Sequence, residues 1–233
     1  MDPSSQDTFS LRDIFRRERL DALLSASVLI FVAYLLEHFA NLYAFLYLAR
    51  PTSNHVGDIF LDNIPVVNLN FLIVETAFVA IILGFFFVLS RPRYVLFTIK
   101  SLALFVAIRA VFISLTHVGI YPDHVIIGLG FFDQIYQYLN FQTGLFFSGH
   151  TGLPMLMALI FWKELPARVV FLALSFVFGI SVLLAHVHYS IDVLAAPFMA
   201  YGIFKLSQNF FPRDYKLIEA APSVEKLFGR RSS

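Results

Sequence analysis

Residues 66–90 have the sequence VVNLNFLIVETAFVAIILGFFFVLS, an apolar run that contains one charged side chain, Glu75. A helix over this run would rise about 1.5 Å per residue and reach about 37 Å, which exceeds the roughly 30 Å of hydrocarbon in a bilayer. The run therefore predicts a transmembrane helix. It also sets the length scale by which the rest of the chain can be divided.

The composition of the whole chain is also that of a membrane protein. Of its 233 residues, 58% are hydrophobic and 14% are charged, and the mean hydropathy is +0.75, outside the usual range of soluble domains. The net charge of +1 lacks the basic excess of nucleic-acid-binding proteins, and the absence of Cys excludes disulfides and thiolate nucleophiles. We therefore expect an integral membrane protein with no nucleic-acid partner.

The other apolar runs complete a predicted set of six transmembrane helices. They cover residues 22–49, 94–118, 146–163, 167–187 and 189–210. We expect an all-α, multi-pass membrane domain over residues 22–210, with tails at 1–21 and 211–233. The first run is longer than a signal-peptide core and no small-residue cleavage site follows it, so we expect it to be retained. Residues 119–145 have a mixed character and predict a short interfacial segment between the third and fourth helices.

The basic residues predict the orientation of these helices. All 17 Lys and Arg residues except Arg50 and Arg109 fall in the N-terminal tail, near the turns around 91–100 and 163–168, or at the C-terminal end from Lys205 onward. By the positive-inside rule, both termini are then cytoplasmic. The opposite end collects most of the titratable side chains in the loops: Asp58, Asp62, Asp123, His124, Asp133, His150, His186, His188 and Asp192. A reaction, if there is one, would take place on the non-cytoplasmic side.

The first of two polar motifs opens the fourth predicted span. It is Ser148-Gly149-His150-Thr151, and we expect it at a helix N-terminus. Free backbone N–H groups and the helix dipole favour an anion there, and Gly149 allows close approach of the backbone, so phosphate is the ligand that this geometry suits. His150 could act as a general acid toward an oxygen that leaves phosphorus.

The second motif lies between the fifth and sixth predicted spans. His188 and Asp192 are four residues apart, which on a helix would bring the carboxylate within reach of the imidazole and fix its tautomer. One helix leads away from His150 and the next leads back, so His188 returns to the same end. Together the motifs predict a nucleophile, an orienting carboxylate and a general acid.

Two other interpretations of these residues stay open. In the first, Ser148, His150 and Thr151 cap a helix, and His188 with Asp192 forms a satisfied polar pair. In the second, His186, His188 and Asp192 bind a metal ion, although side chains two residues apart on a helix diverge. We favour catalysis without metal or cofactor, because both motifs return to an end nearly free of Lys and Arg.

The two motifs resemble those of the type 2 phosphatidic acid phosphatase superfamily and, within it, the sphingomyelin synthase-like branch. The resemblance is close over 147–151 and 186–193. It implies that His188 attacks phosphorus to form a phosphohistidine, that Asp192 orients it, and that His150 serves the leaving or accepting hydroxyl.

This sequence lacks two cations that the lipid phosphatases of the superfamily use to hold phosphate. Position 182 is Val where an Arg would stand, and no Lys precedes Arg91-Pro92 at the required spacing. This loss matches the sphingomyelin synthase-like branch. Looser similarity to that branch extends over 58–65 and from Arg109 to Asp123.

Several further residues are candidates for substrate binding. Arg109 falls in the outer half of the third span, where an Arg needs a partner; it could hold the substrate phosphate or pair with Glu37 or an outer-loop Asp. For Glu75 we expect a structural hydrogen bond. The full predicted set is Ser148, Gly149, Thr151, Arg109, Tyr189 and Glu37 for substrate, with His150, His188 and Asp192 as catalytic residues.

The leading functional hypothesis is a lipid phosphotransferase. It would move phosphocholine or phosphoethanolamine from a glycerophospholipid to ceramide or another lipid hydroxyl, so its partners would be a donor and an acceptor lipid. A phospholipase C-like hydrolase or lipid phosphatase would use the same site with water as the acceptor. A lipid-binding membrane protein without catalytic activity is the alternative outside the enzymes.

Overall fold

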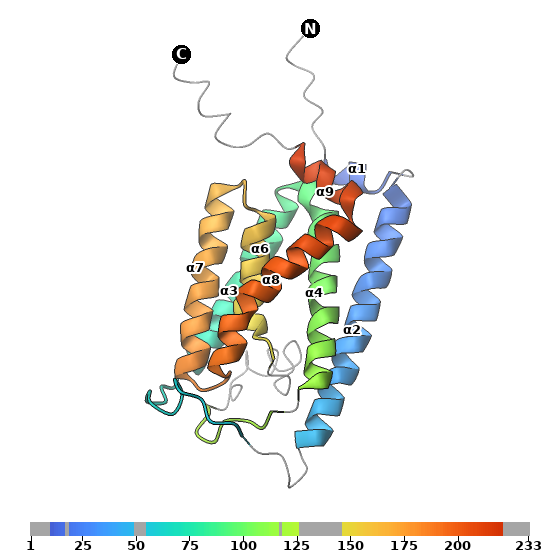
Figure 1. Ribbon diagram of the computed structural model, residues 1–233. Helices are drawn as coiled ribbons and strands as arrows, with labels where there is room; N and C mark the ends of the chain where they lie inside the picture. Colours follow the sequence, from blue (N-terminus) through green and yellow to red (C-terminus); the bar gives the residue numbers. More distant parts are fainter. Residues whose placement is uncertain (1–9, 17–18, 49–54, 117, 126–145, 221–233) are drawn as a thin grey trace, which may run out of the picture.

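The computed structural model describes residues 10–16, 19–48, 55–116, 118–125 and 146–220, and all regular secondary structure in these ranges is helical (Figure 1). This confirms the predicted all-α class. Of the predicted interfacial segment 119–145, only residues up to 125 are described, and they form a loop; the remainder lies outside the described residues, as do the outer parts of both tails.

A helix occupies each of the six predicted positions. The long helices are α2 (Leu20–Leu48), α3 (Asn70–Leu89), α4 (Val95–Leu115), α6 (Gly149–Ile160), α7 (Leu165–Leu184) and α8 (Ser190–Phe210). A short helix α1 (Leu11–Ile14) precedes them, a 3-10 turn (Pro92–Tyr94) leads into α4, and α9 (Pro212–Glu219) follows α8.

Four of these helices are long and apolar enough to cross a membrane: α2, α3, α4 with its 3-10 turn, and α7. Helix α6 is apolar but has 12 residues, which reach about 18 Å and cannot cross the hydrocarbon alone. Helix α8 has 21 residues but is not one of the four. The structure thus supports a multi-pass membrane protein. By helix length and hydropathy, four helices among the described residues can cross the membrane, where the sequence predicted six.

The helices form two packed groups joined by α4 (Figure 1). Helix α2 lies along α4 on one side, and α6 packs against both α7 and α8 on the other, with α8 running obliquely to its neighbours. Helix α4 is the most buried of the four long apolar helices, whereas α2 and α3 expose most of their apolar side chains. In a bilayer, α2 and α3 would face lipid and α4 would form the centre of the bundle.

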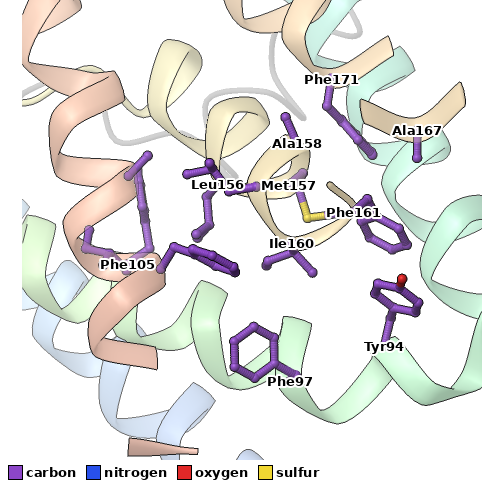
Figure 2. Close-up of a cluster of buried hydrophobic side chains, with 14 of the residues drawn as sticks. Tyr94, Phe97, Phe105, Leu156, Met157, Ala158, Ile160, Phe161, Ala167 and Phe171 are labelled. Carbon is purple, nitrogen blue, oxygen red and sulfur yellow. The ribbon is translucent and has the colours of Figure 1, made fainter. Parts of the chain in front are cut away.

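The core is built largely from aromatic rings around α6 (Figure 2). Tyr94 and Phe161 stack with their ring centroids 4.5 Å apart, and Phe161 also contacts Phe171 of α7. The ring of Phe105 occupies the space beside Gly152, where an added Cβ would lie 2.8 Å from its Cζ. Gly152 therefore lets α4 approach α6 closely and helps to fix the position of the α6 N-terminus.

The basic end of the bundle is closed by ion pairs and by the short helices α1 and α9 (Figure 1). The Lys100 ammonium lies 2.7 Å from the Asp214 carboxylate, and both side chains are buried. Arg91 pairs with Glu164 at 3.3 Å, and Lys163 donates to the Glu219 carbonyl. The helices next to the two tails, α1 and α9, thus lie at the same end of the bundle, as the distribution of Lys and Arg predicted. That this end is cytoplasmic stays a prediction.

Candidate active site

The first motif forms the N-terminus of α6, as predicted. Ser148 is the N-cap residue, and its Oγ accepts a hydrogen bond from the Thr151 N–H at 3.4 Å. The Ser148 N–H donates to the Asp192 carbonyl at 3.1 Å. This last bond joins the start of α6 to the first turn of α8, so the two motifs are connected through the backbone.

The second motif differs from the prediction in one respect. His188 was expected on the same helix as Asp192, but α8 begins at Ser190 with Tyr189 as its N-cap, so His188 precedes the helix. The reason is local: the Asp192 carboxylate accepts the Tyr189 N–H at 3.1 Å and thereby fixes the helix start. His188 still comes within reach, because its Nδ1 lies 3.4 Å from Asp192 Oδ2.

The structure brings the two predicted catalytic histidines together. The ring centroids of His150 and His188 are 5.7 Å apart, and the ring planes are inclined by 68°. His188 and Asp192 are buried, and the His150 ring also contacts Phe178 of α7. Two imidazoles and one carboxylate are therefore held close together at the N-termini of α6 and α8.

Arg109 of α4 lies beside the start of α6. Its guanidinium forms an ion pair with Glu37 of α2, and its Nε donates to the Phe147 carbonyl at 3.1 Å. An added Cβ on Gly149 would lie 3.5 Å from Arg109 Nε, so the glycine allows the guanidinium to lie against the start of α6. The pairing with Glu37 is thus observed, and the cation also lies beside the predicted phosphate site.

The other predicted substrate-binding residues have partners within the protein. Thr151 is buried, and its carbonyl accepts from the Ser175 hydroxyl at 2.8 Å. The Tyr189 hydroxyl donates to the Gly119 carbonyl at 2.7 Å and accepts from the Val56 N–H at 3.2 Å. Tyr189 is therefore tied to two outer loops, an arrangement that favours a structural role over substrate contact.

One expectation about a single residue is not met: the half-buried side chain of Glu75 makes no hydrogen bond within the described part of the chain, where a structural hydrogen bond was expected. For the metal alternative that includes His186, no group of three His, Cys, Asp or Glu residues in the described ranges is placed to hold a metal ion. The buried ring of His186 instead packs edge-on against Tyr121, and its backbone has a φ of 53°.

Asp58 is the residue whose position the sequence did not reveal. It lies in the loop before α3, is buried, and accepts the Ser190 N–H at 2.7 Å. Its other oxygen accepts the N–H groups of Phe60 and Leu61. Burial alone would raise the pKa of Asp58, but the hydrogen bonds from Ser190, Leu61 and Phe60 outweigh it and hold the pKa below its usual range. The sequence placed Asp58 at the outer end and within the segment 58–65 of looser family similarity, but nothing in it indicated the contact with Ser190.

Comparison with known proteins identifies one region of the chain. Residues 143–209 match the family model described as PAP2 superfamily C-terminal; the match contains α6, α7, all of α8 except its last residue, and both motifs. Neither the curated proteins nor the solved structures returned a match. The chain is therefore similar to this family over residues 143–209, a region that covers less than a third of its length.

Proposed function

We propose that the protein transfers a phospho-headgroup between membrane lipids, with His188 as the nucleophile. The observation that carries the proposal is the arrangement of His188, Asp192 and His150: the carboxylate lies 3.4 Å from His188 Nδ1, and the second imidazole lies 5.7 Å away between ring centroids. Two histidines with separate environments can divide the roles of nucleophile and proton carrier.

In the first step, Nε2 of His188 attacks the phosphorus of a glycerophospholipid. The Asp192 carboxylate accepts a hydrogen bond from Nδ1–H, which keeps the proton on Nδ1 and leaves the lone pair on Nε2 for the attack. A P–N bond forms and the P–O bond to the glycerol oxygen breaks. His150 gives a proton to that oxygen, so diacylglycerol leaves and the headgroup phosphate stays on His188.

In the second step, the hydroxyl of an acceptor lipid such as ceramide takes the place of diacylglycerol. His150, now neutral, removes the hydroxyl proton while the oxygen attacks phosphorus and the P–N bond breaks. The headgroup is transferred, and both histidines return to their initial protonation states. The protein's own residues carry every step of this sequence.

The surroundings of the histidines suit a phosphodiester anion. The N-terminus of α6 presents backbone N–H groups and the positive end of its dipole, and Arg109 adds a cation beside Gly149. Glu37 neutralises part of the Arg109 charge, so we expect this cation to position the phosphate rather than to bind it tightly. Because the Arg109–Glu37 pair has little net charge, it should hold the phosphate weakly enough for the product lipid to leave.

Hydrolysis is the competing reaction at the same site. The family match supports lipid phosphate chemistry in general and does not distinguish water from a lipid acceptor. Product analysis separates the two. Purified protein in mixed micelles with fluorescent ceramide, phosphatidylcholine and phosphatidylethanolamine should yield a headgroup-bearing ceramide.

The matched controls for this assay are His188→Ala, which should give no product, and His55→Ala, an exposed histidine in the loop before α3, which should retain activity. Diacylglycerol release without a ceramide product would favour hydrolysis. Lipid binding without turnover in the wild type would favour the non-catalytic alternative.

A further inference from the structure

The connection between α7 and α8, which carries His188, is held by two loops from elsewhere in the chain. The Val67 N–H donates to the Leu184 carbonyl at 2.8 Å, and the Val125 N–H donates to the Ala185 carbonyl at 2.9 Å. The Tyr189 hydroxyl bonds to the backbone of both loops, at Val56 and Gly119. The catalytic segment is therefore not positioned by its own helices alone.

Asp58 provides the charged contact in this set. The first N–H groups of a helix have no intrahelical partner, and the N-cap Tyr189 makes no side-chain cap hydrogen bond to them; its hydroxyl bonds to the outer loops. Two carboxylates fill this role instead: Asp192 accepts the Tyr189 N–H, and Asp58 accepts the Ser190 N–H. An anion at a helix N-terminus is further stabilised by the helix dipole.

Because Asp58 accepts the Ser190 N–H, the Asp192 carboxylate is left to face Tyr189 and His188. Its Oδ2 faces both the Tyr189 N–H and His188 Nδ1. With Asp58 removed, the Ser190 N–H would lose its acceptor, and Asp192 is the other carboxylate at this helix start. A turn of Asp192 toward Ser190 would draw it away from the imidazole.

We propose that Asp58 is a positioning residue for the His188–Asp192 pair, acting through the Ser190 N–H to hold the start of α8. Asp58 itself belongs to a rigid turn, because Phe60 and Leu61 donate to its Oδ1 and its own N–H donates to Asp62 Oδ2. Asp62 in turn accepts the Tyr121 hydroxyl, which joins the two outer loops. The expected effect of Asp58 on the reaction of His188 rests on the proposed function. Its effect on the position of the α8 N-terminus does not.

The kinetic test follows phosphohistidine formation in the full-length protein in nanodiscs of phosphatidylcholine and phosphatidylethanolamine. Asp58→Ala should slow labelling of His188 by about 10- to 100-fold, the usual range for a group that orients a catalytic residue, with the final labelled fraction unchanged. Asp58→Asn, which keeps an acceptor oxygen, should fall between Asp58→Ala and wild type. Asp123→Ala, an exposed acid in the other loop, is the matched control and should label at the wild-type rate.

A merely structural role would give the opposite pattern, with a lower labelled fraction at an unchanged rate, and would overturn the proposal. Amide hydrogen exchange supplies a readout independent of activity: Asp58→Ala should raise exchange at residues 186–193 while α3 and α7 stay as in the wild type. Unchanged exchange at 186–193 would also overturn it. Should the wild type form no phosphohistidine with either lipid, the proposed function fails, and exchange alone decides whether Asp58 positions this segment.

Discussion

The two ends of the helical bundle each bury a pair of oppositely charged or chargeable groups, yet they differ in what surrounds the pair. At the basic end, Lys100 and Asp214 meet at 2.7 Å and join α4 to α9. At the outer end, His188 and Asp192 lie 3.4 Å apart, with a second imidazole, His150, close by. The Lys–Asp pair satisfies its charges internally, whereas the imidazole keeps a second nitrogen for chemistry.

The comparison shows that buried charge alone does not mark an active site in this protein. What separates the outer end is the presence of two histidines at the N-termini of α6 and α8, where backbone N–H groups favour an anion. The basic end has ion pairs but no histidine in the described ranges of the chain. Changes at the outer end should therefore affect catalysis, and changes at the basic end should affect stability.

The largest effect is expected at the outer end from His188→Ala. Removal of the nucleophile should lower headgroup transfer by at least about 10³-fold, because the covalent intermediate can no longer form. Transfer to fluorescent ceramide is the measurement, with unfolding temperature as the check on folding. Retention of a tenth of wild-type activity would show that His188 is not the nucleophile.

Asp192→Asn should reduce the rate by roughly 10²- to 10⁴-fold, as expected when a catalytic histidine loses the charge that orients it. The amide oxygen can still accept the Tyr189 N–H, so the helix start should persist. Steady-state rates and the far-UV circular dichroism spectrum check the two halves of this expectation. A loss of helix content equal to the loss of rate would assign Asp192 to folding alone.

At the basic end, Lys100→Met should destabilise the protein by about 3–5 kcal/mol, because Asp214 is left buried without its partner. The double variant Lys100→Met/Asp214→Leu should recover most of that loss. Turnover per folded molecule should equal that of the wild type in both variants. Thermal unfolding in nanodiscs and lipid transfer test this together, and a selective loss of turnover would end the proposed separation of the two ends.

In the first turn of α6, Gly152→Ala should cost about 1–3 kcal/mol, because the new methyl group would overlap the Phe105 ring. Gly202→Ala is the control: an added Cβ there meets no atom within 4 Å, and alanine favours a helix, so this change should stabilise the protein slightly. The difference in unfolding temperature between the two variants measures the effect. Equal temperatures would mean that α4 and α6 pack less closely than described.

The smallest effect concerns pH. The folded protein lowers the pKa of Asp58, so the stability that this group contributes is present above its unfolded value, about 3.9, and is lost as the pH falls through the folded value. The stability difference between wild type and Asp58→Asn should therefore shrink as the pH is lowered from 6 to 3. Thermal unfolding at both pH values tests the sign, and a difference that grows toward acid would contradict it.

Local patterns in the sequence predicted the local features well. The apolar runs gave a helix at each predicted position, and Ser148 and Gly149 marked the start of α6. The return of His188 to the same end as His150 followed from helix lengths alone. These features depend on residues near one another in the chain, which periodicity and capping rules describe.

Long-range contacts were beyond those patterns. The hydrogen bond from Ser190 to Asp58 joins residues 132 positions apart, and the Lys100–Asp214 pair spans 114. Both depend on how the helices pack, which no local rule encodes. The placement of His188 before α8, and not on it, is by contrast a local effect, since Asp192 accepts the Tyr189 N–H at the helix start. The short α6 could not be told from a full span by hydropathy.

The most direct test of the central claim is to look for the covalent intermediate on His188. Wild-type protein is mixed with phosphatidylcholine without an acceptor, quenched in base, which preserves phosphohistidine, and mapped by peptide mass spectrometry. The account predicts a phosphocholine adduct on His188 that is absent in His188→Ala and that disappears when ceramide is added. Turnover of phosphatidylcholine with no adduct on His188, or with the adduct on His150, would contradict it.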